Sequence, residues 1–103
     1  MVELHKRKKI EVIIETPARP LLIDVLNRAG SPGYTLIPAI GGRGLRSAWD
    51  RNQLMDAANQ VIIVTIVSEE AAETIMAEVG KLLEDYRGVV TLSDVQVLRG
   101  GRF

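Results

Sequence analysis

The segment Gln60–Val67, which reads QVIIVTIV, constrains the fold more than any other part of the sequence. Every residue after Gln60 is β-branched, and β-branched residues favour extended strands. Successive side chains of a strand point to opposite faces, so apolar residues such as Ile62 and Ile63 occupy both faces. We therefore expect this strand inside a sheet, with both of its faces buried.

Three other segments are predicted to be strands. Residues 9–15 alternate between two sides in the manner of a strand. Residues 34–40 form a second apolar run, and Pro38 within it places that strand at a sheet edge or at a bulge, because proline lacks the N–H that a central strand donates. Residues 89–98 supply the last strand before a short C-terminal tail.

Two segments are predicted to be helices. Residues 18–29 carry apolar side chains at helical spacing and are followed by Gly30, a residue type that commonly ends helices. The second helix is expected to begin after Ser68, whose side chain can cap it, and to close at Arg87-Gly88. Its predicted apolar stripe consists of Ala72, Ile75, Met76, Val79, Leu82 and Leu83.

The predicted order is therefore strand, helix, strand, strand, helix, strand, which is the βαββαβ arrangement of a ferredoxin-like α+β sandwich. With right-handed crossovers, the first and third strands lie at the centre of the sheet and the second and fourth at its edges. Two helices cover only one face of such a sheet, yet Gln60–Val67 is apolar on both. We therefore expect a homo-oligomer that packs through its sheets, since a large exposed apolar face favours aggregation.

The composition excludes several classes of protein. The 103 residues suit one domain spanning residues 1–103, and 47% hydrophobic with only 4% aromatic residues imply an aliphatic core. Thirteen basic residues balance 13 acidic ones, which argues against a general binder of nucleic acids or anionic membranes. Cysteine is absent, which removes disulfides and thiolate metal sites and favours a cytoplasmic protein. No apolar run approaches the roughly 20 residues of a membrane-spanning helix.

The polar segment at about residues 41–59 is the strongest functional candidate. Loops of this length are uncommon in a small domain and are usually functional or disordered. This one opens with GGRG (residues 41–44), in which glycines let backbone amides approach an anion and arginine adds a forked donor. The alternative interpretation is a flexible hinge at the base of the loop. Two further glycine-arginine clusters, residues 87–88 and 99–102, favour the anion site, and the three clusters can converge across an oligomer interface.

No constellation of residues for catalysis or metal binding is evident. Paired carboxylates and a serine nucleophile motif are lacking, and the single histidine, His5, is expected to be solvated. An enzyme with its active site at a subunit interface is the second hypothesis. An RNA-binding module is the third, but the predicted strands lack stacking aromatics. Trp49 is interpreted either as an anchor of the loop against its own protein or as a contact for a partner.

Several segments together resemble the PII and PII-like signalling proteins. They are KKIEVII (residues 8–14), GYTLIPAIGGRG (residues 33–44), the long loop before QVIIVTIV, and the SEE start of the second helix. PII proteins are trimers of ferredoxin-like subunits that bind adenine nucleotides in the clefts between subunits and dock on transporters or enzymes through a long T-loop. The resemblance, which covers nearly the whole chain, implies a non-enzymatic homotrimeric regulator whose T-loop is residues 41–59.

The resemblance also implies positions for the ligands. Thr35 matches the threonine of the family's G-x-T strand, and Ile66 and Val67 match two residues beside the adenine. The glycines of residues 41–44 fall at the start of the T-loop, and Arg99 looks like an arginine that faces phosphate. The nucleotide-binding residues implied in this way are Thr35, Gly41, Gly42, Arg43, Gly44, Ile66, Val67, Arg87, Gly88, Arg99 and Arg102.

Departures from the family pattern narrow these implications. The lysine of the family's B-loop is missing, so ADP or AMP is expected in preference to ATP. No tyrosine occurs between Gly41 and Asn59, and the C-terminal region is short, features that argue against sensing of 2-oxoglutarate. The chain looks more like the divergent branch associated with carboxysomes and bicarbonate transport, whose members are implied to sense adenylates and inorganic carbon.

For that branch, bicarbonate is expected near Arg43 or Arg46, where backbone amides and a guanidinium can hold a small anion. The loop is expected to dock on a membrane transporter or another regulated protein through Arg46, Trp49 and Arg51. No catalytic cofactor, metal, nucleic acid or membrane insertion is expected. The alternative is a general PII-like adenylate sensor with a different second effector.

Overall fold

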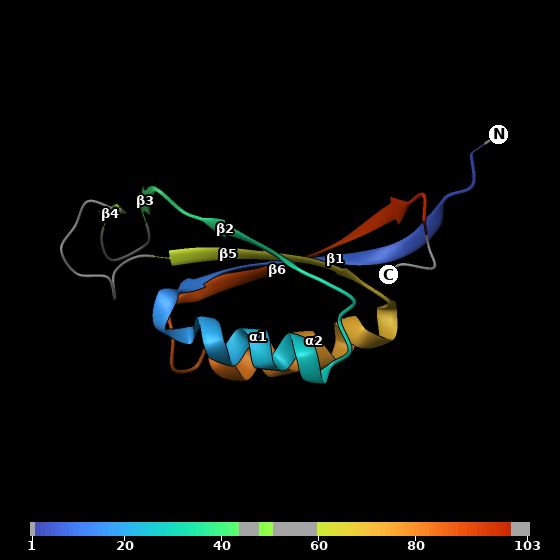
Figure 1. Cartoon of the computed structure of the whole chain (residues 1–103). Coiled ribbons are helices and arrows are strands. Elements are labelled where there is room, and N and C mark those ends of the chain that lie inside the picture. The colour runs from blue at the N-terminus through green and yellow to red at the C-terminus, as the bar shows by residue number, and fades with distance from the viewer. Residues whose placement is uncertain (1, 44–47, 51–59, 100–103) are drawn as a thin grey trace.

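The described part of the chain folds into an antiparallel sheet with two helices on one of its faces (Figure 1). The structure, a computed structural model, describes residues 2–43, 48–50 and 60–99. In chain order its elements are β1 (His5–Glu15), a short 3-10 helix (Thr16–Ala18), α1 (Arg19–Arg28), β2 (Thr35–Pro38), β3 (Gly41–Arg43), β4 (Ala48–Asp50), β5 (Gln60–Val67), α2 (Glu69–Leu82) and β6 (Gly88–Val97).

The main sheet has the strand order β2-β5-β1-β6, with every neighbouring pair antiparallel. Strands β1 and β5 lie at the centre, and β2, which contains Pro38, lies at an edge. The predicted ferredoxin-like α+β fold and its strand order are therefore confirmed. The strand expected over residues 34–40 is shorter than predicted, because only Thr35–Pro38 pairs with β5.

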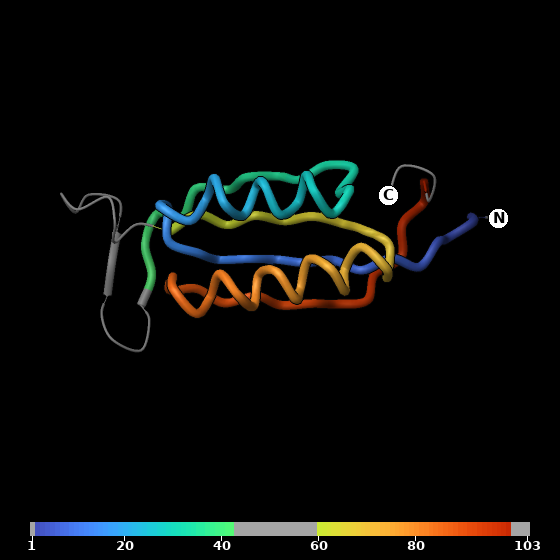
Figure 2. Tube along the Cα trace, turned by 90° about the horizontal axis from the view of Figure 1, so that it is seen from below, coloured from blue at the N-terminus to red at the C-terminus, as the bar shows by residue number. Residues whose placement is uncertain are grey.

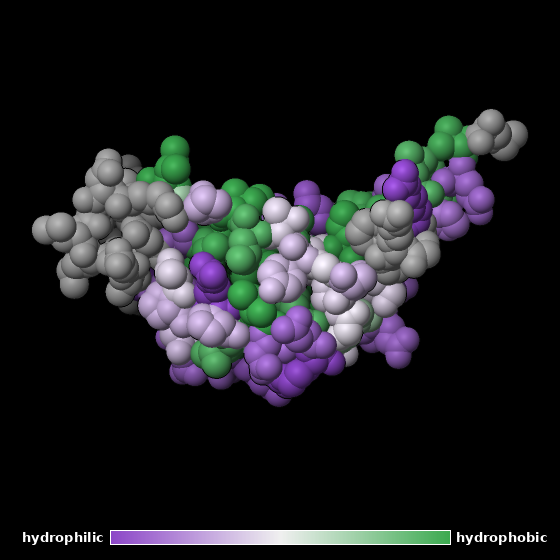
Figure 3. Space-filling view, viewed as in Figure 1, coloured by the Kyte–Doolittle hydropathy of each residue, from purple (hydrophilic) through white to green (hydrophobic). Residues whose placement is uncertain are grey.

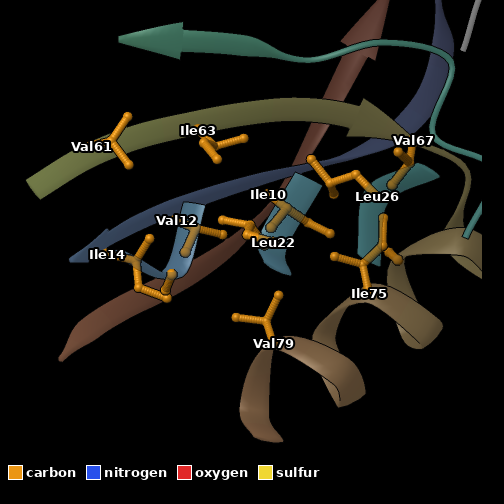
Figure 4. Packing of buried hydrophobic residues seen from close by; sticks show 12 residues of the cluster. Ile10, Val12, Ile14, Leu22, Leu26, Val61, Ile63, Val67, Ile75 and Val79 are labelled. Carbon is orange, nitrogen blue, oxygen red and sulfur yellow. The ribbon is translucent and has the colours of Figure 1, made fainter. Parts of the chain in front are cut away.

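The core lies between the helices and the sheet. Helix α1 runs along β2 and β5, and α2 runs along β1 and β6 (Figure 2). Leu22 and Leu26 of α1, with Ile75 and Val79 of α2, point toward the aliphatic side chains of the strands (Figure 4). Strand side chains alternate between the two faces, and the aliphatic ones buried on this face are Ile10, Val12, Ile14, Val61, Ile63 and Val67.

Local signals in the sequence set the helix boundaries. Ser68 caps α2, since its hydroxyl accepts a hydrogen bond from the amide of Ala71 at 3.2 Å. Helix α1 ends at Arg28, and Gly30, which has a φ of 79°, follows its last cap residue, Ala29. The amides of Gly30 and Ser31 donate to the carbonyls of Asn27 and Leu26, the hydrogen-bond pattern of a Schellman cap.

The predicted end of α2 at Arg87-Gly88 is wrong, because the helix ends at Leu82. A turn over residues 83–87 follows, in which the amide of Tyr86 donates to the carbonyl of Leu82 at 3.0 Å. Gly88 pairs with Ile14 in β1, so the chain must reverse direction before it reaches this glycine. Tertiary pairing thus overrides the local helical pattern.

Strand β1 begins at His5, earlier than the predicted start at residue 9. Its first residues pair with the end of β6, the outermost pair being His5 with Val97. Strand β5 pairs with β1 only as far as Lys8. The two-stranded extension beyond this point, hereafter the arm, projects past the helices at the right of Figure 1. The first residues of β1 are basic and show no alternation of apolar side chains. Backbone pairing with β6 therefore determines that they form a strand.

The prediction of an irregular loop throughout residues 41–59 is wrong for two short segments. Strands β3 and β4 form a separate two-stranded sheet in which Gly42 pairs with Trp49. Glycines are poor strand formers, so the sequence signal for β3 is weak. This ribbon lies at the end of the molecule opposite the arm (Figure 1).

The sheet face opposite the helices carries a row of apolar side chains. Register aligns Ile37, Ile62, Ile13 and Val89 across all four strands. Ile37 and Val89 are 41% and 50% exposed, and no helix of the described residues lies over this face (Figure 1). The outer surface of the helical layer, in contrast, is largely hydrophilic (Figure 3).

Candidate functional site

A cavity of about 280 Å³ lies where β2 begins beside β5. Residues 32–35 form one wall and residues 64–66 form the other. Thr35 makes the first ladder pair of β2, with Val64, and the preceding residues of the chain are not paired with β5. The cavity is therefore the space left where the chain leaving α1 approaches the sheet and has not yet joined it.

The chain that forms the first wall is fixed at both ends. The Schellman cap at Gly30 and Ser31 fixes its start, and the pair between Thr35 and Val64 fixes its end. Between these points, the hydroxyl of Thr65 donates to the carbonyl of Gly33 at 2.7 Å. The Ser31 hydroxyl donates to the same carbonyl at 2.9 Å and lies 2.8 Å from the Thr65 hydroxyl.

The lining of this cavity suits a flat heterocycle with polar substituents. Pro32, Val64 and Ile66 are apolar, and Tyr34, which is 39% exposed, adds an aromatic ring. Such surfaces gain from dispersion and stacking with an aromatic base. The hydroxyl of Thr35 and the backbone of residues 32–35 supply donors and acceptors that can select among such ligands.

The structure brings together two of the predicted nucleotide-binding residues, Thr35 and Ile66, which both line this cavity. Val67, predicted beside them, is fully buried in the core under the helices. Adjacent residues of a strand face opposite sides, so Ile66 and Val67 do not share a surface.

The base of the loop lies farther along the same sheet edge. Gly41 and Gly42 are in β3, and of Arg43 and Trp49 the structure describes only the backbone. Gly44, Arg46, Arg51 and Arg102, which were also predicted to bind ligands or a partner, lie outside the described residues.

The cluster Arg87-Gly88 has partners of its own. The Arg87 carbonyl accepts from the amide of Glu15 at 3.1 Å, and the Arg87 Nε lies 3.9 Å from a carboxylate oxygen of Glu15. A Cβ at Gly88 would collide with the backbone oxygen of Ile13, so β6 can approach β1 this closely only with glycine here. Packing alone therefore requires a glycine at this position.

The predicted arginine-glycine clusters lie at opposite ends of the sheet. Gly88 is at the same end as the loop base, because Pro38, Val61, Ile14 and Gly88 form one row across the strands. Arg99 follows the far end of β6, which is 10 residues long and spans roughly 30 Å. Within one chain, Arg99 and Arg87 do not meet.

A second hollow, of about 610 Å³, lies between the arm and the start of α2. Lys8 and Asp94 pair across it by a hydrogen bond between their charged groups, and Glu69 lies nearby. The hydrogen bond from Lys8 holds the pKa of the Asp94 carboxyl below its usual value, and the bond to Asp94 raises the pKa of the Lys8 ammonium. None of the predicted site residues lines this charged hollow.

Sequence reasoning did not identify Tyr34 or Thr65 as residues that line the cavity, or Ser31 as a residue that bonds to its wall. The signal for Thr65 was present, because it is the single hydroxyl-bearing residue in QVIIVTIV. At 3% exposure it is also the one buried polar side chain in the described segments.

Two searches of the described residues bear on metals and membranes. No group of three or more histidine, cysteine, aspartate or glutamate side chains is arranged to hold a metal ion. None of the helices is both long enough and apolar enough to cross a membrane.

The chain was compared with protein families, curated proteins and solved structures. The sequence matches the family described as Nitrogen regulatory protein P-II over residues 7–102. Among the curated proteins, none matches. A structure of CPII from Thiomonas intermedia K12 bound to ADP and bicarbonate is similar at 32% identity and a TM-score of 0.89, with 100% of this chain and 99% of that chain covered.

Two other solved structures extend the comparison. CPII bound to ADP, AMP and bicarbonate matches at 28% identity and a TM-score of 0.91, covering 100% of this chain and 98% of that chain. The GlnK–ATP complex of B. subtilis shares the fold at 15% identity and a TM-score of 0.65, covering 87% of this chain and 82% of that chain. The family match spans most of the sequence, and the predicted resemblance is confirmed: this chain belongs to the nitrogen regulatory protein P-II family.

Proposed function

We propose that this protein is a non-enzymatic cytoplasmic regulator that binds adenine nucleotides in clefts between the subunits of a homotrimer. ADP and AMP are its favoured nucleotides, bicarbonate is its second effector, and residues 41–59 dock on a membrane transporter or another regulated protein. Ligand binding at the loop base selects among loop conformations, to the extent that the ligand prefers one of them.

The observation that carries this proposal is the cavity between residues 32–35 and 64–66 in a chain that matches CPII over its whole length. CPII has been solved with ADP, AMP and bicarbonate bound. In this chain the cavity has apolar and aromatic walls with a hydroxyl beside them, which suits an adenine ring.

The positions of the arginine and glycine clusters support a site shared between subunits. A nucleotide in the cavity needs cationic or amide donors for its phosphates, and among the described residues Gly41, Gly42, Arg87, Gly88 and Arg99 do not line the cavity of the same chain. A second copy can supply them, because Gly88 and Gly41 lie at one end of the sheet and Arg99 at the other. The apolar row through Ile13 and Ile62 offers the surface for packing the copies.

The missing lysine supports the nucleotide preference. At the position of the family's B-loop this chain offers Arg87, and its guanidinium faces Glu15 at 3.9 Å. A third phosphate would therefore meet a partly neutralised cation. ADP and AMP carry less charge and depend less on that group.

The experiment that tests the proposal is isothermal titration with ADP, AMP and ATP, each with and without bicarbonate in an otherwise carbonate-free buffer. Adenylate binding that strengthens with bicarbonate establishes two linked sites, because coupling between ligands is reciprocal. Adenylate affinity that does not change with bicarbonate would contradict the second effector and support a general adenylate sensor. Absence of adenylate binding refutes the proposed function and leaves the shared fold alone.

The variant Arg43→Ala tests the loop base. We expect it to weaken nucleotide or bicarbonate binding about tenfold without changing the mass of the assembly, since a charge-assisted contact is lost. Arg19→Ala, an exposed arginine at the start of α1, is the matched control. Equal affinities of Arg43→Ala and the control would remove Arg43 from the site.

A further inference from the structure

We propose that Thr65 and Ser31 are positioning residues that set the shape of the ligand cavity by holding the carbonyl of Gly33. The inference rests on the proposed function for the identity of the ligand. It concerns residues to which neither the family resemblance nor the sequence pattern gave a role. Neither hydroxyl needs to touch the ligand, because both act through the backbone of the wall.

Thr65 lies in an apolar part of the core. Its side chain points to the helix face of β5, between the buried side chains of Ile63 and Val67, and it pairs with Ile10. Every other residue named here is aliphatic, and Thr65 itself is only 3% exposed. A hydroxyl at such a site is costly unless it makes a hydrogen bond.

The Thr65 hydroxyl is paired with the carbonyl of Gly33. A hydroxyl has one proton and two lone pairs, and Thr65 gives its proton to the carbonyl of Gly33 at 2.7 Å. The Ser31 oxygen lies 2.8 Å from the Thr65 oxygen and 2.9 Å from the same carbonyl, and its single proton can serve either of these two acceptors. Two hydroxyls and one carbonyl therefore form a closed group that links β5 to the segment leaving α1.

The hydroxyls of Thr65 and Ser31 contact the chain at a wall of the cavity. Gly33 lies in the stretch between the Schellman cap of α1 and the first pair of β2, so no ladder hydrogen bond fixes it. The same residues, 32–35, form one wall of the cavity, and residues 64–66 form the other. The Thr65 hydroxyl spans the two walls and thereby sets the distance between them.

This arrangement predicts that affinity and stability respond differently to two substitutions. In Thr65→Val the methyl groups fill the buried site and no hydroxyl is left unsatisfied, so global stability stays close to that of the wild type. The carbonyl of Gly33 loses its donor on β5 and keeps only Ser31 from its own segment, so the wall loosens and the dissociation constant for ADP rises about five- to tenfold. In Thr65→Ser the hydroxyl is kept and a buried methyl is lost, so affinity stays within about twofold while thermal stability falls.

The experiment combines titration with ADP, thermal unfolding and amide hydrogen exchange on the full chain. Thr65→Val, Thr65→Ser and Ser31→Ala are compared with Thr74→Val, which removes an exposed hydroxyl on α2. We expect Thr65→Val to speed hydrogen exchange at the amides of residues 33–35 in the absence of ligand. We expect Ser31→Ala to raise the dissociation constant for ADP by about half as much, on a logarithmic scale, as Thr65→Val does. Thr65→Ser should restore both the affinity and the slow exchange.

Two results would overturn the inference. One is unchanged affinity and unchanged exchange in Thr65→Val. The other is a loss of affinity in Thr65→Val and Thr65→Ser alike, in proportion to their loss of stability, which would make Thr65 merely a core residue. If the wild type binds no adenylate, the proposed function fails, and the exchange rates of residues 33–35 alone then decide whether the hydroxyls anchor this wall.

Discussion

The two faces of the sheet carry similar side chains in different surroundings. On the helix face, Ile63 is 1% exposed and packs under α1 and α2. Its neighbour Ile62 points to the opposite face, where the same apolar row includes Ile37 at 41% exposure and Val89 at 50%. Within one chain, only one of the two apolar faces of β5 is therefore covered, and the proposed homotrimer would cover the other.

The open face is not uniformly apolar, and this distinguishes it from the core. Lys9 and Glu11 of β1 lie in the rows beside Ile13 and face the same way. Charged side chains between apolar ones are typical of surfaces that select one geometry of association over others. In the core, in contrast, the fit of side-chain shapes alone determines how the helices pack on the sheet, because the buried residues are aliphatic apart from Thr65.

The largest effect is expected on the covered face. Ile75→Ala removes a side chain that is fully buried between α2 and the sheet, and should lower the free energy of unfolding by about 2–5 kcal/mol. Urea denaturation followed by circular dichroism measures this change, with the exposed neighbour Thr74→Ala as control. A cost equal to that of the control would mean that the helix face is not the core.

The next effect concerns assembly through the open face. Ile62→Asp places a charge in the apolar row, so the proposed trimer should dissociate and the mass in solution should fall about threefold. Light scattering after gel filtration measures the mass. Leu21→Asp, at a residue of α1 that is 45% exposed, should leave the mass unchanged. Dissociation by Leu21→Asp but not by Ile62→Asp would move the interface to the helical side.

A smaller effect is expected when a single valine of the open face is shortened. Val89→Ala should cost about 1 kcal/mol at high protein concentration and less at low concentration, because that side chain is covered only in the assembly. Val79→Ala, at a fully buried valine of α2, should cost the same at every concentration. Thermal unfolding over a dilution series distinguishes the two, and parallel behaviour of the two variants would contradict a covered open face.

The smallest effect on stability is expected for the ion pair of Lys8 and Asp94. This pair lies next to the arm, where the helix face of the sheet carries charged instead of apolar side chains. The pKa of Asp94 is lowered mainly by its hydrogen bond from Lys8, so this pair stabilises the fold above the unfolded carboxyl pKa. That contribution is lost as the pH falls through the lower pKa of the folded state. Asp94→Asn should slightly lower the unfolding temperature at pH 7, and the difference should shrink in acid below about pH 4.

The control for this variant is Asp85→Asn, which removes a carboxylate from the turn after α2. The Asp94 carboxylate is largely exposed to solvent and is screened by salt, so added salt should also reduce the effect of Asp94→Asn. An effect that is as large at pH 3 as at pH 7 would show that Asp94 acts by packing and not by its charge.

Patterns in the sequence were sufficient for the sheet and its order, because apolar periodicity reports directly on burial. The residues of β5 and the cap at Ser68 lie where they were predicted. The start of β1 at His5 and the end of α2 at Leu82 were not predictable, since each depends on backbone pairing with distant residues. The pairing of Gly42 with Trp49 was missed because glycines give a weak strand signal.

The candidate site was predictable only in part. Thr35 and Ile66 could be placed in one cavity through the family resemblance. The group formed by Ser31, Gly33 and Thr65 could not, because its hydroxyls meet a carbonyl from another part of the chain at a spacing that no local pattern encodes. Hydrogen bonds of this kind appear only once the fold is known.

The strand order has a consequence for how the chain reaches its fold. Strand β1 precedes the other strands, yet its neighbours are β5 and β6, and the pair of His5 with Val97 joins segments from the two ends of the chain. Contacts of such high sequence separation slow folding, because a long loop must close before they form. During synthesis, the apolar side chains of β1 remain uncovered until most of the chain has left the ribosome, and the nascent protein is open to aggregation during that interval.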